Sequence, residues 1–194
     1  CQSADAEVAL HHIPRLAGID VEHSYTNSDA IKDYLMPFAK KMWDDKCRVD
    51  GTVPFTHDDY VKIWSLNDPY IAADYVLLDE AQDTSPVMLS IMQAQANRGT
   101  RVVLVGDSAQ QIYSWRGAIN ALAAFPDAPR LMLSQSFRFG QVIAEVANAV
   151  LSHLEEPTTL VMKGLEAIQS RLDSLESPDC ILCRTNAGAV SHLL

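Results

Sequence analysis

Two short apolar runs that end in carboxylates constrain the fold of this chain most strongly. The run 75–78 ends at Asp79 and Glu80. The run 102–105 is followed, after one glycine, by Asp107. Each run is too short for a helix and rich in Val and Leu, which predicts a strand that is buried on both faces. Because a parallel sheet presents its ligand site at the carboxyl ends of its strands, the acidic ends are candidates for one site.

The segment between the two runs is predicted to be a helix. Ser85 is a good N-cap residue, and Pro86 suits the first helical position because its missing N–H is not needed there. Gly99 follows the last turn. Apolar residues recur on one side at helical spacing, namely Val87, Met88, Ile91, Met92 and Ala94. A strand, a helix and a second strand predict a parallel pair with a right-handed connection, which brings both acidic ends to the same edge.

The residue types at this edge suit phosphate chemistry. Asp79, at the end of an apolar strand, is placed to hold Mg²⁺ through the ion's retained waters. Side chains alternate along a strand, so Glu80 points elsewhere and is free to orient or deprotonate a water that attacks a phosphate. The pair resembles the Walker B acids of a P-loop NTPase. Two acids that close a strand also occur in solvated turns and helix caps, so the assignment depends on the stretches that follow.

Several further stretches occur in a characteristic order. They are residues 79–83, 106–110, 112–118 and 135–138. Together they resemble successive motifs of superfamily 1 DNA helicases, with the order and spacing of the UvrD/Rep branch. Residues 56–60 and 135–140 resemble the F-box DNA helicase members of that branch most. The resemblance covers roughly residues 52–155 and reappears at 181–187, and several motifs in the right order are more specific than any one of them.

The resemblance implies an α/β fold, with a P-loop NTPase (RecA-like) parallel sheet that carries helices on both faces, plus a helical insertion. It implies that residues 1–68 are part of the helical insertion of the first motor domain. Residues 69–128 would be the C-terminal half of the first RecA-like ATPase domain, and residues 129–194 the start of the second. The implied cofactors are ATP and Mg²⁺, and the implied partners are single-stranded DNA and DNA duplex junctions.

The resemblance also implies roles for two residues beyond the acidic pair. Gln110 matches the glutamine that senses the γ-phosphate, and an amide suits this role because it donates to phosphate oxygen or orients water. Arg138 matches the arginine of the second motor domain that reaches the γ-phosphate, where a guanidinium stabilises the spread charge. Apart from the motifs, Gln110 reads as an exposed loop residue and Arg138 as a surface ion-pair partner.

The stretch 112–118 carries a candidate platform for nucleic acid. Trp115 and Arg116 lie next to each other and close to Tyr113. An exposed Trp beside an Arg can stack on unpaired bases without regard to their sequence. The alternative is a Trp that is buried against the following helix. The resemblance favours the platform and assigns Tyr113, Trp115 and Arg116 to DNA binding.

Composition limits the class of protein. The 194 residues are 48% hydrophobic and 21% charged, which is ordinary for a soluble globular chain. The net charge of −10 is unlike that of a dedicated nucleic-acid-binding module, so any DNA contact must be local or come from other parts of the protein. Four scattered cysteines indicate a reducing compartment, and Cys180 and Cys183 read as strand residues, not as a metal pair.

The sequence contains no run of about eighteen apolar residues and no basic-then-apolar leader. We therefore expect no membrane partner and a cytoplasmic location, or a nuclear one in a eukaryote, without secretion. Protein partners cannot be inferred. The histidines at positions 11, 12 and 23 are predicted to be solvated or packed, because no Cys or carboxylate in the sequence pattern completes a ligand set with them.

Other elements are predicted from periodicity and capping. Asn27 and Ser28 are expected to cap a surface helix that packs by an apolar stripe, which consists of Ile31, Tyr34, Leu35, Phe38, Ala39 and Met42. Thr56 and Asp59 are expected to cap a second helix, with Tyr60, Val61, Ile63 and Trp64 facing mainly inward. The remaining predictions are helices at 4–12, 118–125, 142–154 and 163–176 and strands at 131–135 and 180–184.

The sequence contains no Gly-x-x-x-x-Gly-Lys-Ser/Thr phosphate cradle. In the resembled family this cradle precedes the helical insertion, so we expect the chain to be an internal fragment of an ATP-dependent DNA helicase that unwinds 3′ to 5′ in DNA repair or recombination. The fragment alone is expected to show no ATPase activity. The alternative is a catalytically inactive nucleic-acid-binding or scaffold module derived from a helicase. An RNA helicase of the same superfamily is disfavoured by residues 113–116.

Overall fold

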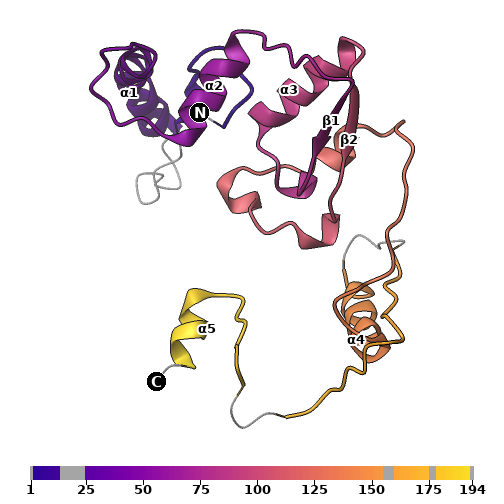
Figure 1. The fold of residues 1–194 in the computed structure, drawn as a ribbon. Helices are drawn as coiled ribbons and strands as arrows, with labels where there is room; N and C mark the ends of the chain where they lie inside the picture. Colours follow the sequence, from indigo (N-terminus) through magenta and orange to yellow (C-terminus); the bar gives the residue numbers. More distant parts are fainter. Residues whose placement is uncertain (1, 14–24, 155–159, 175–177, 193–194) are drawn as a thin grey trace. The chain divides into compact units, whose positions relative to one another are not determined.

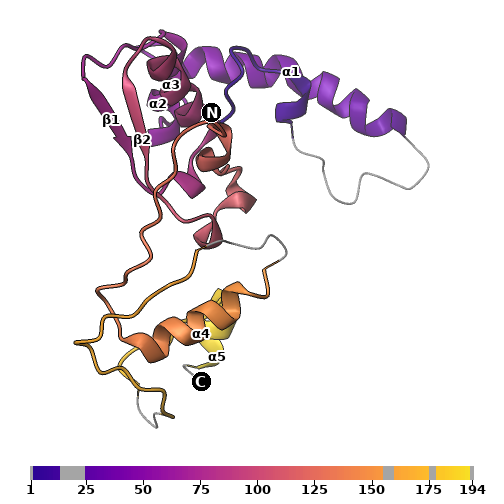
Figure 2. The same ribbon diagram turned by 90° about the vertical axis from the view of Figure 1, so that its right-hand side faces the viewer.

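The computed structural model describes residues 2–13, 25–154, 160–174 and 178–192. The chain divides into two compact units, residues 1–128 and 129–194. Figures 1 and 2 show its elements in two views. Its helices and strands are α1 (Tyr25–Lys46), α2 (His57–Leu66), β1 (Tyr75–Leu78), α3 (Pro86–Asn97), β2 (Arg101–Leu104), α4 (Gln141–Leu151) and α5 (Asn186–Ser191).

The centre of the first unit is the β1–α3–β2 motif. The two strands are parallel, with Tyr75 opposite Arg101 and Leu78 opposite Leu104. Hydrogen bonding continues past the strand ends, because the Val105 N–H donates to the Leu78 carbonyl at 2.8 Å and the Ala81 N–H donates to the Val105 carbonyl at 2.9 Å. The predicted strands and their parallel pairing are therefore confirmed, and both strands deliver their carboxyl ends to one edge.

Helix α3 begins and ends where its capping residues predict. The Ser85 hydroxyl accepts a hydrogen bond from the Met88 N–H at 3.2 Å, and Pro86 is the first helical residue. Gly99 follows with a φ of +92°, a conformation that favours glycine because it has no Cβ. Val87, Ile91 and Met92 are buried against one face of the two strands. Full burial of such a side chain stabilises the fold by about 1.5–3 kcal/mol.

The strands are not buried on both faces, so this part of the prediction is wrong. Burial alternates along β1 and β2, and Leu77, on the face away from α3, is 70% exposed. Within the described residues the sheet has only two strands, and α3 packs on one of its faces. The structure is compatible with an α/β fold, but helices on both faces of a larger sheet remain an implication of the family resemblance.

Helix α2 shows the predicted capping box and an unexpected buried side. The Thr56 N–H donates to the Asp59 carboxylate at 2.7 Å, and the Lys46 ammonium of α1 donates to the same oxygen at 2.6 Å. Burial raises the pKa of Asp59, but the hydrogen bonds from Lys46 and Thr56 outweigh it, so the pKa lies below its ordinary value. The Asp59 carboxylate therefore joins the two helices as a buried ion pair.

The inward residues predicted for α2 are partly wrong. Tyr60 and Trp64 are exposed, whereas Lys62 is buried. The Lys62 ammonium donates to the backbone carbonyls of Ser3 at 2.8 Å and Asp5 at 2.5 Å, which supplies the partners that a buried charge requires. The N-terminal segment thus covers the side of α2 that carries Lys62, a residue that was not among those predicted to face inward.

Helix α1 also departs from expectation. It begins at Tyr25, so the predicted caps Asn27 and Ser28 lie inside the helix. Its predicted stripe is packed only in part, since Tyr34, Phe38 and Met42 are exposed whereas Ile31, Leu35 and Ala39 are half-buried. The Tyr34 and Phe38 rings contact one another, with centroids 5.5 Å apart. The predicted helix at 4–12 is reduced to a 3-10 turn at Leu10–His12, and the one at 118–125 to a turn at Ala121–Ala124.

In the second unit, α4 confirms the predicted helix at 142–154, although it ends at Leu151. The helix at 163–176 is absent from its described part, residues 163–174. The backbone there pairs with residues 134–139 instead. The Lys163 N–H donates to the Ser134 carbonyl and the Ser136 N–H to the Lys163 carbonyl, each at 2.8 Å. Groups used in this pairing are not free to form helical hydrogen bonds.

The strands predicted at 131–135 and 180–184 are also wrong. Gln135 forms a single bridge with Lys163, and residues 180–184 have no strand partner in the part of the chain that the structure describes. An apolar run becomes a strand only when another strand satisfies its backbone. The thiols of Cys180 and Cys183 are free. No helix among the described residues is long and apolar enough to cross a membrane.

Candidate functional site

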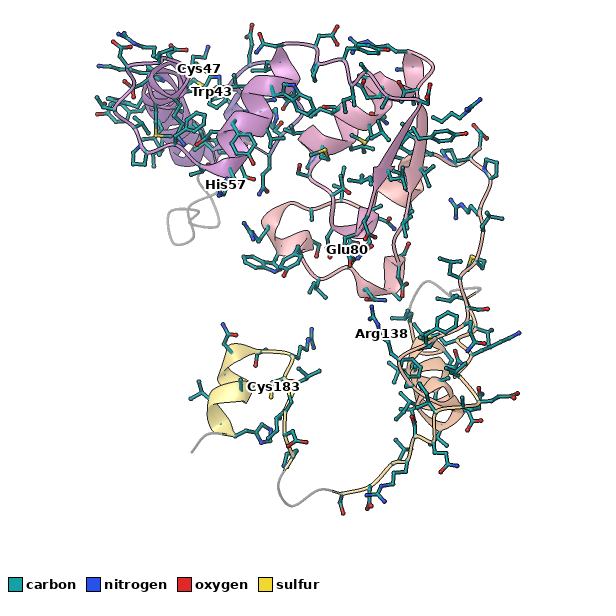
Figure 3. All side chains as sticks on the ribbon, in the orientation of Figure 1. Trp43, Cys47, His57, Glu80, Arg138 and Cys183 are labelled. Atoms are coloured by element: carbon teal, nitrogen blue, oxygen red, sulfur yellow. The ribbon has the colours of Figure 1, made fainter. Side chains whose placement is uncertain are left out.

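Asp79 and Glu80 directly follow the end of β1, and Figure 3 labels Glu80. Glu80 has a φ of +51° and a ψ of +40°, the left-handed conformation that non-glycine residues seldom adopt. This turn directs the chain into a 3-10 turn at Ala81–Asp83. The Asp79 carboxylate accepts the Glu80 N–H at 2.9 Å, which helps to hold the strained residue. Strained backbone of this kind costs about 1–3 kcal/mol and concentrates at functional sites.

A cavity of about 370 Å³ opens beside this pair. Its walls come from the end of β1, the start of α3 and the segment 113–118, with Gln2 and Asp58 added by other parts of the first unit. The lining includes the carboxylates of Asp79, Glu80 and Asp83 and the guanidinium of Arg116. The structure therefore brings the predicted metal-binding acid and part of the predicted DNA platform to the same cavity.

The donor set of the cavity fits Mg²⁺. Mg²⁺ prefers oxygen ligands and binds through one or two carboxylates while it keeps several waters. Asp79, Glu80 and Asp83 line the cavity, and each carries a carboxylate that could supply one or two such ligands. The sequence contains no phosphate cradle of the P-loop type that could complete a nucleotide site with these residues.

Gln82 connects the two strand ends and was not given a role by the sequence. Its side chain is 2% exposed. The amide Nε2 donates to Glu80 Oε2 at 2.6 Å, and the amide Oε1 accepts the Asp107 N–H at 3.0 Å. Asp107 in turn accepts hydrogen bonds from the Ala109 N–H at 3.0 Å and from Gln110 Nε2 at 2.8 Å. One hydrogen-bonded chain therefore joins Glu80 to Gln110.

Asp83 holds the loop that carries the predicted platform. Its Oδ1 accepts the N–H groups of Ile112 at 3.2 Å and Tyr113 at 3.0 Å. The only sequence signal for this role was a third carboxylate close behind Asp79 and Glu80, and that signal did not indicate its partners. The turn Ala81–Asp83 thus contacts both the loop of Asp107 and the loop of Tyr113.

Trp115 lies on the surface of the first unit. Its side chain is 78% exposed, and Arg116 Cζ lies 5.9 Å from the centroid of the Trp115 ring. Tyr113 is also exposed. The alternative of a Trp buried against the following helix is therefore wrong in this structure. A flat, accessible ring beside a guanidinium has the chemistry of a base-stacking surface, although its contact with DNA stays a prediction.

Arg138 belongs to the second unit (Figure 3). It is exposed, and its backbone N–H donates to the Ser136 hydroxyl at 3.2 Å. Its role at the γ-phosphate stays a prediction from the family resemblance.

A separate cluster joins Asp5, His11 and His12, which the sequence pattern did not connect. Asp5 Oδ2 lies 2.6 Å from His11 Nε2 and 2.8 Å from His12 Nε2. His12 Nδ1 accepts the Ala9 N–H at 2.9 Å, so the Nε2 of a neutral His12 carries the proton and donates to Asp5. Hydrogen bonds from Ser3, His11 and His12 lower the pKa of Asp5 to about 2. The ligand atoms of the three side chains lie within 4.8 Å of one another, so the geometry could also hold a metal ion, and a carboxylate does accompany two of the histidines, contrary to the expectation from the sequence.

Comparison with known proteins supports the resemblance. Residues 67–125 match the UvrD/REP helicase N-terminal domain family. F-box DNA helicase 1 of Gallus gallus is 36% identical over 153 residues, which are 76% of this chain and 15% of that protein. F-box DNA helicase protein 1 of Schizosaccharomyces pombe is 34% identical over 185 residues, or 91% of this chain and 20% of that protein. ATP-dependent DNA helicase PcrA of Leuconostoc citreum is 39% identical over 88 residues, or 43% and 12%.

The chain thus spans a fifth or less of each of these relatives. The matched family includes both strand ends, the cavity residues of α3 and the platform loop, since all of them fall within 67–125. The resemblance to UvrD-like superfamily 1 helicases that the motifs indicated is confirmed.

Proposed function

We propose that this chain, which carries a segment of a UvrD-like superfamily 1 helicase, works as part of an ATP-dependent DNA helicase. ATP hydrolysis at the edge of β1 and β2 would drive translocation on single-stranded DNA and unwinding of duplex junctions, in the 3′ to 5′ direction and in DNA repair or recombination. The relatives support the helicase activity by their names, which include DNA helicases from bacteria and eukaryotes.

The observation that carries the proposal is the hydrogen-bonded edge at the strand ends. Asp79 and Glu80 lie at the cavity, and the chain through Gln82 and Asp107 reaches Gln110. In the proposed reaction Asp79 holds Mg²⁺ through water, and Glu80 orients or deprotonates the water that attacks the γ-phosphate. Gln110 contacts the γ-phosphate or this water through its amide. Mg²⁺ supplies charge neutralisation on the phosphates when it is bound.

The second unit and the platform complete the proposal. Arg138 would stabilise charge on the γ-phosphate from the second motor domain, to which we assign residues 129–194. Residues 69–128 would belong to the first RecA-like domain and residues 1–68 to its helical insertion. Tyr113, Trp115 and Arg116 would contact single-stranded DNA by stacking and charge, and their loop is attached to the acidic edge through Asp83.

The test uses the full-length protein that contains these residues. Glu80→Gln keeps the size and hydrogen bonding of the side chain but removes the base, so DNA-stimulated ATP turnover should be abolished while Mg²⁺-ATP binding persists. Asp79→Ala should weaken Mg²⁺-ATP binding as well, because it removes the metal-binding carboxylate. Glu145→Gln, which changes an exposed glutamate of α4, is the matched control and should turn over ATP as the parent does.

Near-normal turnover in the Glu80→Gln protein would refute the assignment of Glu80. A full-length protein that binds single-stranded DNA but has no ATPase activity would support the inactive binding or scaffold module instead. Equal displacement of RNA and DNA strands would argue against a DNA-specific motor.

A further inference from the structure

Gln82 is one of the most deeply buried polar side chains of the first unit, at 2% exposure. A buried amide costs free energy unless its donors and its acceptor are used. Both ends of this amide are used, by Glu80 Oε2 at 2.6 Å and by the Asp107 N–H at 3.0 Å. Gln82 is therefore a buried, fixed side chain that is hydrogen-bonded to the exposed carboxylate of Glu80.

The orientation of the amide follows from its partners. A backbone N–H can only donate, so the atom that faces Asp107 must be the amide oxygen. The NH₂ group then has to face Glu80. The Glu80 carboxylate is an acceptor, so this pairing is the only one in which both contacts are hydrogen bonds. In a flipped amide the NH₂ group would face the Asp107 N–H, donor against donor, and the oxygen would face the Glu80 carboxylate, acceptor against acceptor.

Packing holds the amide in this place. A Cβ added at Gly106 would lie 2.4 Å from Gln82 Oε1 and 2.9 Å from the Ala81 backbone nitrogen. The absence of a side chain at Gly106 thus lets the amide oxygen lie directly against the end of β2. Ala81, the residue before Gln82, is fully buried. The donor that reaches Glu80 is consequently anchored to the backbone of both strand ends.

We propose that Gln82 is a positioning residue that holds the Glu80 carboxylate in the orientation required for its work on the attacking water. This inference rests on the proposed function. Glu80 has an exposed side chain, which is free to change rotamer unless something holds it. A carboxylate has about four acceptor sites, so one hydrogen bond from Gln82 leaves others for a water. Misplacement of a catalytic group by about 1 Å can cost about a hundredfold in rate.

The variant Gln82→Glu separates positioning from packing. Glutamate has the same length and keeps an oxygen for the Asp107 N–H, but it replaces the donor that faces Glu80 with a second carboxylate oxygen. We expect kcat for DNA-stimulated ATP turnover in the full-length protein to fall about tenfold to a hundredfold. KM for ATP and the affinity for single-stranded DNA should stay within about twofold, because neither ligand contacts Gln82 in this assignment.

Gln95→Glu is the matched control. Gln95 is also fully buried, and the hydrogen-bond partners of its amide are backbone groups, namely the Ile71 N–H and the carbonyls of Pro69 and Ile91. The control introduces the same buried carboxylate in place of a buried amide, but the hydrogen bonds of this amide go to those backbone groups and not to Asp79 or Glu80. Its kcat per folded molecule, with the folded fraction measured by circular dichroism, should equal that of the parent.

A double variant tests the contact itself. In Glu80→Gln/Gln82→Glu the donor and acceptor exchange places, so an amide of residue 80 can donate to the carboxylate of residue 82. We expect Gln82→Glu to lower the melting temperature in the parent and to lower it clearly less in the Glu80→Gln background. Equal losses in the two backgrounds would overturn the proposed contact.

If Gln82→Glu does not fold, Gln82→Met provides the kinetic test, because Met has a similar length, carries no charge and cannot donate. It should show the same fall in kcat at an unchanged KM. Parent-like kcat in either Gln82 variant, or a fall no larger than that of Gln95→Glu, would overturn the inference while Glu80→Gln remains inactive. An active Glu80→Gln protein would instead overturn the proposed function on which the inference rests.

Discussion

Each end of the β1–α3–β2 motif contains a buried glutamine amide, and the two amides differ in the groups that they contact. At the amino end, the buried amide of Gln95 accepts the Ile71 N–H at 2.8 Å and donates to the Pro69 carbonyl at 2.7 Å. At the carboxyl end, the buried amide of Gln82 contacts one backbone group and one side-chain carboxylate, that of Glu80. The Gln95 amide joins backbone groups to one another, whereas the Gln82 amide holds an exposed carboxylate that we propose to act on the attacking water.

Gly99 and Gly106 show a second difference between the two ends of the motif. Gly99, after α3, has a φ of +92° and no atom within 4 Å of the place where a Cβ would lie, so only its backbone conformation favours glycine. Gly106, after β2, lacks that positive φ but is crowded by Gln82 and Ala81. At the amino end a side chain would strain the backbone, and at the carboxyl end it would displace a neighbour. Substitutions at matched positions can therefore break or sharpen the comparison.

The largest effect is expected from Gly106→Ala in the full-length protein. The new Cβ would overlap Gln82 Oε1, so the amide must move and its hydrogen bond to Glu80 must change. We expect ATP turnover to fall by about a hundredfold, the scale for a misplaced catalytic group. Steady-state phosphate release measures this. Turnover like that of the parent would show that the crowding at Gly106 is relieved without moving Glu80.

A smaller effect, on stability and not on turnover, is expected from Gln95→Ala. The change leaves the Ile71 N–H without its side-chain partner, whereas the Pro69 carbonyl keeps its hydrogen bond from the Arg98 guanidinium. One such group left unpaired costs about 1–3 kcal/mol in the free energy of unfolding. Urea unfolding gives this cost, and turnover per folded molecule should be unchanged. A loss of turnover at full folding would contradict the scaffold role of the amino end.

Trp115→Ala tests whether the platform attached to the carboxyl end binds DNA. We expect affinity for single-stranded DNA to fall by about 1–3 kcal/mol, the range for one lost base–aromatic stack, and to fall about equally for different sequences. The melting temperature should change little because the ring is exposed. Trp64→Ala, which removes an exposed Trp from α2, is the control and should leave DNA affinity unchanged. If both variants bind DNA as the parent does, Trp115 is not part of the site.

Gly99→Ala should give the smallest effect. A side chain in the left-handed region costs about 1–2 kcal/mol, and the open space around Gly99 adds no collision. The free energy of unfolding should fall by about this amount at unchanged turnover. A cost as large as that of a core cavity would indicate crowding that the structure does not show at this position.

The sequence alone was sufficient for the parts of the molecule whose signals are local. Ser85, Pro86 and Gly99 mark the ends of α3, and Thr56 and Asp59 mark the start of α2, because a cap bonds groups within a turn of itself. The apolar runs before Asp79 and Asp107 predicted β1 and β2 and the edge they share. The helicase resemblance followed from the order of the motifs, which is read directly from the sequence.

The tertiary structure decided everything that depends on a distant partner. The runs at 131–135 and 180–184 have strand-like composition but no strand beside them in the described residues, and the side of β1 that holds Leu77 has no covering helix there. Lys62 is buried because carbonyls near the N-terminus accept its hydrogen bonds. Composition cannot supply these outcomes, because burial depends on what the rest of the chain places nearby.

The candidate site divides in the same way. Asp79, Glu80 and Gln110 could be selected from their motifs, but the connection between them could not. Gln82 bonds Asp107, which is 25 residues away, and Asp83 bonds Tyr113, which is 30 residues away. A sequence pattern indicates which side chains carry donors and acceptors, and only the folded chain determines which of them meet, because a hydrogen bond requires its atoms within about 3 Å of each other.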